Sequence, residues 1–257
     1  MTTTIESTPY EILPFKMDDG LMARAAIGLI VLSIDQTMEY EWRRIIDLPG
    51  VAFFESRIPC PPDITPERLM EMQKDIASGT ELLLPGLDLN VVAFGCTSGA
   101  IVIGEEEVFA QIRKVRPDVA CTTPITAALE GLKALGAKRI ALLTPYVESV
   151  NNLFKDHIES FGVEISRIAT FNHSVDADVA RIDSETLKNA ILKIGAADNV
   201  DAVFVSCTSL RMCDHTREIE QLLGKPVLAS NSAMAWHALR LAGIDDVLPQ
   251  WGRLFEV

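Results

Sequence analysis

The sequence contains 257 residues, of which 48% are hydrophobic and 23% charged, enough to bury one large core or two of about half that size. Its formal net charge of -13 leaves no diffuse positive field for nucleic acid or an anionic membrane surface. The first residues lack the basic start and apolar run of a signal peptide, and no apolar segment is long enough to span a bilayer. We therefore expect a cytoplasmic protein with no nucleic-acid or membrane partner.

Short apolar runs rich in Val, Ile and Leu alternate with longer segments of helical period along the chain, which predicts an α/β fold. In chain order, strands are expected at 27–33, 50–58, 90–96, 139–145, 166–172, 201–207 and 226–230. Helices are expected between them, at 66–84, 105–114, 124–136, 147–161, 183–195, 214–223 and 232–242.

The expected elements repeat. The strands that begin near Ile27 and Ile140 lie 113 residues apart, Cys96 and Cys207 lie 111 apart, and "LKALG" at 132 and "LRLAG" at 239 lie 107 apart. Offsets this similar predict two pseudo-symmetric lobes, each a parallel sheet flanked by helices. The alternative is the ordinary recurrence of strand–turn–helix units in any α/β protein.

Two cysteines occupy matching places in this repeat, in "AFGCTSGA" and "VFVSCTSL". Ligands of open parallel sheets bind beyond the carboxyl ends of the strands, where Cys96 and Cys207 are expected. A helix start at such a position would stabilise a thiolate, although a cysteine often only packs. The other three cysteines, Cys60, Cys121 and Cys213, have no matching partner and are interpreted as structural.

Hydroxyl groups follow both of these cysteines. Thr97 and Ser98, repeated as Thr208 and Ser209, would form a cradle of donors for a carboxylate, or would simply cap helices. No C-x-x-C pair, Cys/His cluster, P-loop or G-x-G-x-x-G motif occurs, so we expect neither a metal nor a nucleotide cofactor.

Further polar residues are expected at the carboxyl ends of strands. Tyr146 follows a strand and could donate to a carboxylate or enolate, or could pack as an ordinary aromatic residue. Asp35 and Gln36 follow the equivalent strand of the first half; an acid there could bind an ammonium group, act as an acid or base, or cap a helix. Asn231 lies at the donor-rich start of a helix in "SNSAMAWHAL".

In these residues and motifs the chain resembles the aspartate/glutamate racemase superfamily. "GCTSG" and "SCTSL" carry that likeness, while "IGLIVLSIDQTMEYE", "TPY", "SNSAMAWHALRLAG" and "GRLFEV" are similar to the branch of maleate cis-trans isomerases, arylmalonate decarboxylases and ectoine-utilisation racemase-like proteins. The resemblance implies a cofactor-independent enzyme with the active site in the cleft between the two lobes, and it implies a homo-oligomer. It also implies discontinuous lobes, residues 1–119 with 231–257 as the first and 120–230 as the second.

The resemblance assigns roles as well. Cys96 and Cys207 match the family's two catalytic cysteines, Tyr146 its carboxylate-binding tyrosine, and Thr97 with Ser98 its carboxylate or enolate cradle. The decarboxylases lack the first cysteine, which disfavours decarboxylation. Maleate isomerases have an asparagine where Asp35 aligns, whereas the ectoine-utilisation members have an acidic residue, which favours a substrate with a cationic nitrogen.

We therefore expect a two-cysteine racemase or isomerase of a small carboxylate, amino-acid-like or ectoine-related. In a racemisation one thiolate removes the proton next to the carboxylate and the opposite thiol returns one to the other face. In a cis-trans isomerisation a thiolate adds to a double bond instead. The alternatives are a maleate isomerase, an arylmalonate-type decarboxylase, and a small-carboxylate binding protein without turnover.

Overall fold

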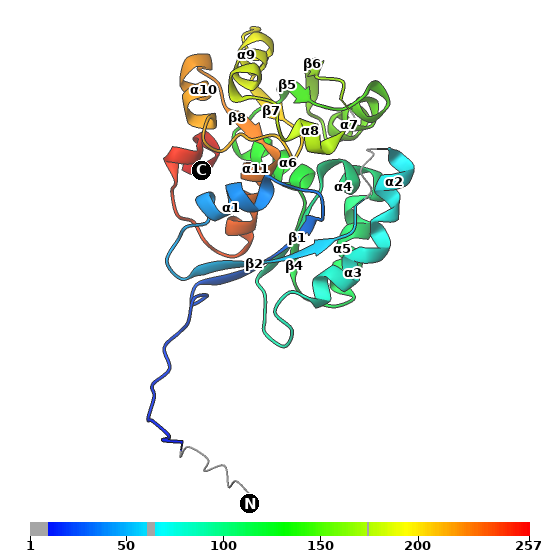
Figure 1. Ribbon diagram of the computed structural model, residues 1–257. Helices are drawn as coiled ribbons and strands as arrows, with labels where there is room; N and C mark the ends of the chain where they lie inside the picture. The colour runs from blue at the N-terminus through cyan, green and yellow to red at the C-terminus, as the bar shows by residue number, and fades with distance from the viewer. Residues whose placement is uncertain (1–9, 61–64, 174) are drawn as a thin grey trace, which may run out of the picture.

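The computed structural model describes residues 10–60, 65–173 and 175–257, which form two α/β lobes (Figure 1). Each lobe contains a four-stranded sheet in which every neighbouring pair is parallel, with the order β2-β1-β3-β4 in the first and β6-β5-β7-β8 in the second. The strand order is the same in both sheets, because β5, β6, β7 and β8 take the places of β1, β2, β3 and β4. The predicted pair of pseudo-symmetric lobes is confirmed.

The strands follow the expected repeat. Those of the first sheet are β1 (Ala25–Leu32), β2 (Val51–Ile58), β3 (Val91–Gly95) and β4 (Ala120–Thr122). Those of the second are β5 (Arg139–Thr144), β6 (Glu164–Thr170), β7 (Ala202–Val205) and β8 (Val227–Ala229). The inner strands β1, β3 and β7 are buried along their whole length, which is why they consist of nearly continuous apolar residues.

Helices cover both sheets (Figure 1). In the first part of the chain they are α1 (Met38–Ile45), α2 (Pro66–Glu71), α3 (Gln73–Glu81), α4 (Thr97–Ile103), α5 (Glu105–Arg113) and α6 (Pro124–Ala134). In the rest they are α7 (Glu148–Ser160), α8 (Asp176–Val179), α9 (Ser184–Gly195), α10 (Thr216–Leu223) and α11 (Ser230–Leu241), followed by short 3-10 helices η1 (Pro249–Trp251) and η2 (Arg253–Glu256).

The sequence prediction missed some short elements. Strand β4 has three residues, too few for an apolar period to show, and α1, α4 and α8 are also short. The helix predicted at 66–84 is divided at Met72 into α2 and α3. The strand β7 leads into a turn and not, as expected, into a helix start, because α10 begins only at Thr216.

Helices α6 and α11 join the lobes. They pack against each other, and α11 also packs on β3, β4 and α1, although it follows a strand of the second sheet. The 3-10 helix η1 contacts α10 of the second lobe. The predicted boundaries at 119/120 and 230/231 stay a prediction; β4, at 120–122, pairs with the first sheet, and residues 1–9 and 61–64 of the predicted first lobe lie outside the described residues.

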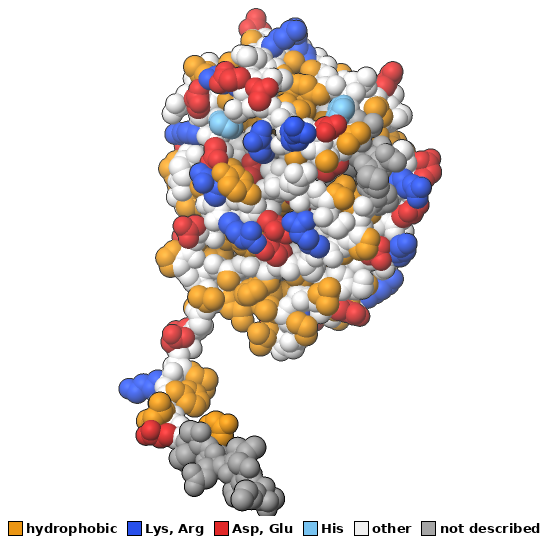
Figure 2. Space-filling view, viewed as in Figure 1, with side chains coloured by type: hydrophobic (Ala, Val, Ile, Leu, Met, Phe, Trp, Pro, Cys, Tyr) orange, Lys and Arg blue, Asp and Glu red, His pale blue; other side chains and the backbone are white. Residues whose placement is uncertain are grey.

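The surface mixes both signs of charge on the face shown in Figure 2. Before β1 the chain runs as an extended arm away from the lobes, and its large apolar side chains, among them Ile12 and Phe15, are exposed (Figures 1 and 2). Over the described ranges, no helix is long and apolar enough to cross a membrane. The cytoplasmic location stays a prediction.

A buried carboxylate ties the first lobe to the second. Glu41, on α1, is 1% exposed, and its Oε1 accepts the backbone N–H groups of Met212 and Cys213 at 2.5 and 2.7 Å. Its Oε2 accepts from Asn231 Nδ2, on α11, at 2.7 Å. Burial raises the pKa of Glu41, and these three donors oppose that rise. The carboxylate thus fixes the loop after β7 against the first lobe.

We predict that Glu41→Ala destabilises the protein. The substitution leaves the buried N–H groups of Met212 and Cys213 without acceptors, which costs about 2–5 kcal/mol of the free energy of unfolding. Chemical denaturation monitored by circular dichroism measures the loss. Glu106→Ala, at an exposed position of α5, is the control and should change stability by less than about 0.5 kcal/mol. Equal stability of the two variants would contradict this role for Glu41.

Candidate active site

A cavity lies between the lobes, at the carboxyl ends of strands from both sheets. It is narrow, with a volume of about 20 Å³, and it is partly open to solvent. Its walls are formed by Leu32, Ile34, Cys60, Arg68, Leu69, Cys96, Thr97, Ser98, Tyr146, Asp176, Cys207 and Thr208. The residues Ile34, Cys60 and Cys96 follow β1, β2 and β3, while Tyr146, Asp176 and Cys207 follow the equivalent β5, β6 and β7. Cys96 of the first lobe and Cys207 of the second therefore line the same cavity.

Cys96 caps the N-terminus of α4. Its Sγ accepts the N–H of Gly99 at 3.2 Å and lies 3.7 Å from Ser98 Oγ. The side chain is 4% exposed. Burial raises its pKa to about 12, and the Gly99 and Ser98 contacts oppose that rise. In the resting protein Cys96 is therefore a neutral thiol.

Glycines on both sides of Cys96 permit this geometry. A Cβ at Gly95 would lie 2.9 Å from the carbonyl oxygen of Ile30, and one at Gly99 would lie 2.5 Å from Cε of Met72 and 3.0 Å from the Cys96 sulfur. Side chains at these positions would push the turn away from the strand and from the thiol. The pattern G-C-T-S-G is thus required by close packing around the cysteine.

Cys207 has a similar setting in the turn after β7. The N–H of Ser209 and the hydroxyl of Tyr146 lie close enough to its sulfur to favour the thiolate, and the side chain is 4% exposed. Burial raises its pKa to about 12, and the negative charge of Asp176 adds to that rise. Both cavity thiols are therefore protonated at neutral pH. The expected activation by a helix start is available to Cys96 alone.

Tyr146 connects the two thiols electrostatically. It is 3% exposed, follows β5, and its ring packs on Phe154 at 5.0 Å between centroids. Burial raises the pKa of its hydroxyl well above the usual value, and both cysteines raise it further. The hydroxyl thus stays protonated, and it lies close enough to Cys207 for the two groups to influence each other's pKa.

Ser230 links the two cysteine turns. Its Oγ accepts the N–H of Cys207 at 3.1 Å and lies 3.0 Å from Oγ1 of Thr97. Ser230 is fully buried at the first position of α11, and the three residues belong to different parts of the chain. The sequence pattern identified Thr97 but not this bridge.

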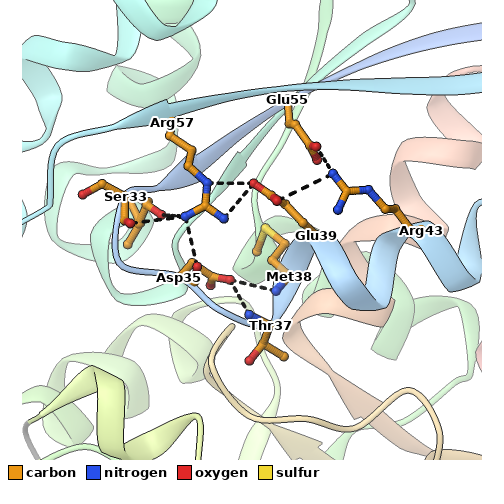
Figure 3. A network of polar contacts seen from close by, with 9 residues as sticks. Ser33, Asp35, Thr37, Met38, Glu39, Arg43, Glu55 and Arg57 are labelled. Carbon is orange, nitrogen blue, oxygen red and sulfur yellow. Dashed lines mark hydrogen bonds and ion pairs between the residues drawn. The ribbon is translucent and has the colours of Figure 1, made fainter.

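Asp35 is buried next to the cavity and does not form its wall. Its Oδ1 accepts the N–H groups of Thr37 and Met38, both at 2.8 Å, so it holds the start of α1 (Figure 3). Its Oδ2 is buried without a hydrogen bond of normal geometry within the described residues, although the Thr208 hydroxyl lies close enough to favour the ionised form. Burial, the largest influence, raises its pKa.

An exposed ion network holds the loop that carries Asp35. The Arg57 Nη1 donates to the backbone oxygen of Asp35 at 3.1 Å and to that of Ser33 at 3.2 Å, while its Nε donates to Glu39 at 2.8 Å (Figure 3). The other carboxylate oxygen of Glu39 lies 3.7 Å from Arg43. Because Arg57 belongs to β2, this network fixes the loop after β1 to the neighbouring strand.

Three other predicted site residues lie off the cavity wall. Gln36 is exposed and lines a separate depression beside Tyr40. Ser209 is buried, and its hydroxyl donates to Asp176 at 2.8 Å. Asn231 is buried between the lobes, where its Nδ2 donates to Glu41 and to the backbone oxygen of Thr208. Thr97, Ser98, Tyr146, Thr208 and both cysteines are brought together as predicted.

Three further residues line the cavity: Asp176 and Arg68, which no sequence pattern indicated, and Cys60, which was interpreted as structural. Cys60 lies two residues after β2 and Asp176 six residues after β6, so the strand-end rule that identified the two central cysteines also applies to them. Burial raises the pKa of Cys60 to about 12, with Asp176 contributing. No group of three or more His, Cys, Asp or Glu residues suited to a metal ion occurs in residues 10–60, 65–173 and 175–257.

Comparison with known proteins gives a consistent set of relatives. Residues 90–255 match the family model described as arylmalonate decarboxylase. The arylmalonate decarboxylase of Bordetella bronchiseptica is 38% identical over 142 residues, which cover 53% of this chain and 58% of the decarboxylase, rather more than half its length. The maleate isomerase of Nocardia farcinica is 28% identical over 242 residues, covering 90% of this chain and 95% of that protein.

Solved structures agree. A Nocardia farcinica maleate cis-trans isomerase mutant, in which a cysteine is replaced by serine, contains a covalently bound succinylcysteine intermediate and superimposes with a TM-score of 0.81 at 25% identity, covering 90% of this chain and 98% of that one. A liganded arylmalonate decarboxylase mutant superimposes with a TM-score of 0.79 at 28% identity, covering 90% and 99%. The predicted superfamily resemblance is confirmed.

We predict that neither cavity thiol reacts readily in the free protein. Because burial raises both pKa values to about 12, alkylation of Cys96 and Cys207 by iodoacetamide should accelerate about tenfold per pH unit from pH 7 to 10, without a plateau. Peptide mass spectrometry gives the rate for each cysteine. A plateau below pH 9 at either position would show a thiolate already present and would contradict this description of the site.

Proposed function

Because the chain belongs to the arylmalonate decarboxylase family, we propose that it is a cofactor-independent isomerase that uses Cys96 and Cys207 to racemise a small carboxylate. The observation that carries the proposal is the shared cavity, where Cys96 of the first lobe and Cys207 of the second follow the equivalent strands β3 and β7. A third thiol on the wall, Cys60, has no equivalent in the second lobe. Racemisation needs two proton-transfer groups of similar pKa on opposite faces of one carbon. Cys96 and Cys207 meet the requirement for similar pKa.

The proposed reaction proceeds through two proton transfers. One sulfur, as thiolate, takes the proton from the carbon next to the carboxylate, so an S–H bond forms and the C–H electron pair enters an enolate. The opposite thiol then gives its proton to the other face of that carbon, which forms the new C–H bond and leaves a thiolate. The two sulfurs exchange protonation states in each turnover, and no cofactor is needed.

The donors on the wall stabilise the charge that develops on the carboxylate oxygens. The hydroxyls of Thr97, Ser98 and Thr208 line the cavity, and the Tyr146 hydroxyl stays protonated. Burial strengthens their electrostatic effect because little water competes inside the cavity. We assign the substrate carboxylate to this set of donors, and we propose an amino-acid-like or ectoine-related compound as substrate.

A second candidate is maleate cis-trans isomerisation. It is favoured by the maleate isomerases that match 90% of the chain and by the succinylcysteine in one of their structures. There a thiolate would add to the double bond, the resulting single bond would rotate, and elimination would restore the thiolate. Decarboxylation is less well supported, because one thiol is enough to protonate the product carbanion and the second would have no role. A binding protein without turnover is the non-enzymatic alternative.

Deuterium exchange tests the proposal. A panel of amino acids, ectoine-related acids, hydantoins, maleate and arylmalonates is incubated with the wild-type protein in deuterated water. For its substrate, the protein should exchange the proton next to the carboxylate and interconvert the two enantiomers. Proton NMR measures exchange and chiral chromatography measures inversion. Activity should persist after dialysis against chelator with no added cofactor.

Single thiol variants provide the mechanistic control. Cys96→Ser and Cys207→Ser should each reduce turnover at least a thousandfold, whereas Cys121→Ser, at a cysteine outside the cavity, should retain it. Interconversion that survives in both cavity variants would disprove the two-thiol mechanism. Binding of a panel member without exchange or conversion would favour the binding protein, and conversion of maleate to fumarate would favour the second candidate.

The tyrosine hydroxyl gives a directional prediction. Tyr146→Phe removes the donor to Cys207 and should slow exchange from the enantiomer whose proton Cys207 removes by about tenfold more than exchange from the other. Initial exchange rates for the separate enantiomers measure this asymmetry. Tyr40→Phe, whose hydroxyl donates to Asp214 outside the cavity, is the matched control. Equal slowing of both enantiomers would place Tyr146 in carboxylate binding alone.

We also propose that the chain assembles as a homo-oligomer. Light scattering coupled to size-exclusion chromatography determines the assembled mass.

A further inference from the structure

One carboxylate on the cavity wall has no role in the proton transfers described above. Asp176 is the first residue of α8, in the segment that follows β6, and it lines the same cavity as both thiols and Tyr146. Its Oδ1 accepts the Ser209 hydroxyl at 2.8 Å, and the N–H of Ser209 in turn contacts the Cys207 sulfur. The carboxylate is therefore held in place by the turn that carries one of the thiols.

This carboxylate has no cationic partner within the described residues. Ser209 is its one hydrogen-bond donor there, and the only charged side chain that shifts its pKa is another acid, Asp35, which raises it. Burial is the largest cause of the raised pKa. A half-buried carboxylate that meets a second acid and no base is costly, because its charge is neither hydrated fully nor paired.

The other charged group on the wall does not compensate it. Arg68 lies at the cavity on α2, but its Nη1 donates to Glu71 at 2.9 Å, and both side chains are about half exposed. That ion pair is locally neutral, and its exposure to solvent screens it. The described wall therefore combines one carboxylate that has no cationic partner with a set of neutral thiols and hydroxyls, and its one cation, Arg68, is already paired with Glu71.

We propose that Asp176 is a specificity-determining residue that binds a cationic nitrogen of the substrate, while the hydroxyl donors near the cysteines bind its carboxylate. The proposal rests on the proposed function, because it assumes that the cavity is the substrate site. It defines the substrate class as carboxylates with a positively charged nitrogen. A dicarboxylate such as maleate would place a second negative charge beside Asp176 and Asp35, where like charges repel strongly in a buried site.

The assignment differs from the one that the sequence favoured. Binding of an ammonium group was one of the three roles that the sequence left open for Asp35, but its Oδ1 caps α1 and its side chain lies behind the wall, next to Thr208. Asp176 comes from the opposite lobe and reaches the cavity itself. Asp35 then acts at a distance, by adding negative potential where the cation binds.

Binding of a cation to Asp176 would also change the pKa of the thiols. The charge of Asp176 raises the pKa of both Cys207 and Cys96, as well as that of Tyr146. A cation bound to Asp176 cancels this influence and adds its own attraction for a thiolate, so the correct substrate favours the ionised nucleophile on arrival. A ligand without the cation leaves both thiols protonated. Selectivity therefore acts on reactivity as well as on binding.

Matched ligands isolate the charge. The compounds 2-aminobutyrate, 2-hydroxybutyrate and ethylmalonate share one carbon skeleton and differ in an ammonium, hydroxyl or carboxylate group on the same carbon, and phenylglycine, mandelate and phenylmalonate form a second set. Isothermal titration of the Cys96→Ser/Cys207→Ser protein with each ligand measures affinity without turnover. We expect the ammonium member of at least one set to bind most tightly and the dicarboxylate least tightly.

Asp176→Asn, made in the same background, should weaken binding of the ammonium member about 10- to 100-fold and tighten binding of the dicarboxylate, which reverses the order. Asp178→Asn is the matched control, since Asp178 lies in the same helix but is exposed and paired with His173. It should leave the order unchanged. A merely structural role for Asp176 would weaken all three ligands alike.

The pH dependence provides a second readout. Ser209, Asp35, Cys60 and the cavity cysteines surround Asp176, and burial raises its pKa, so affinity for the ammonium member should fall as pH decreases through that raised value. The acid limb should be absent in Asp176→Asn. An unchanged ligand order in that variant, or a wild-type preference for the hydroxy or dicarboxylate member, or no binding of either ammonium compound, would overturn the inference.

The two proposals fail in distinguishable ways. If the panel shows racemisation that depends on both thiols but Asp176→Asn keeps the ligand order, only the specificity inference is wrong. If the ammonium ligands bind through Asp176 but no exchange occurs in the wild-type protein, the inference on the binding class stands and the racemase proposal is wrong.

Discussion

The hydroxyl of Ser230 joins the two halves of the site, and the proposed chemistry depends on the geometry that it fixes. It accepts the N–H of Cys207 and contacts the hydroxyl of Thr97, so the turn after β7 and the turn after β3 share one buried hydrogen-bond centre. Glu41 reinforces the arrangement by binding the loop after β7 from the first lobe. A duplicated α/β fold places equivalent strand ends near each other; these buried bonds hold them in register.

Burial then determines the chemistry of the thiols. Removal from water raises the pKa of Cys96 and Cys207 to about 12, and the nearby N–H and hydroxyl donors do not overcome it. Such thiols are protected from stray alkylation and oxidation, but one of them must ionise for any proposed reaction. A positively charged substrate group next to Asp176 resolves this conflict, because it lowers the electrostatic cost of the thiolate only when the substrate is present.

The sequence predicted the fold and part of the site for a clear physical reason. Buried parallel strands consist of apolar runs, and their carboxyl ends collect functional groups, so Cys96, Cys207 and Tyr146 could be identified from position alone. Asp176 lies six residues after β6, on a connection whose direction depends on tertiary contacts such as the bond from Ser209. Cys60 lies two residues after β2, where the positional rule applies, but it has no matching cysteine in the second half of the chain. Asp35 satisfies the same positional rule, but its carboxylate caps α1 and does not form the cavity wall. Strand periodicity does not show whether such a carboxylate caps a helix or faces the cavity.

In the proposed mechanism one small molecule is held between the two opposed sulfurs of Cys96 and Cys207. A crystal structure of the Cys96→Ser/Cys207→Ser protein with a bound substrate, or with the tightest matched ligand, would reveal this arrangement. We expect the two serine hydroxyls to approach opposite faces of the carbon next to the ligand carboxylate, with the carboxylate at Thr97 and Ser98. A ligand bound outside this cavity, or one whose reacting carbon is approached from a single face by both side chains, would disprove the two-thiol mechanism.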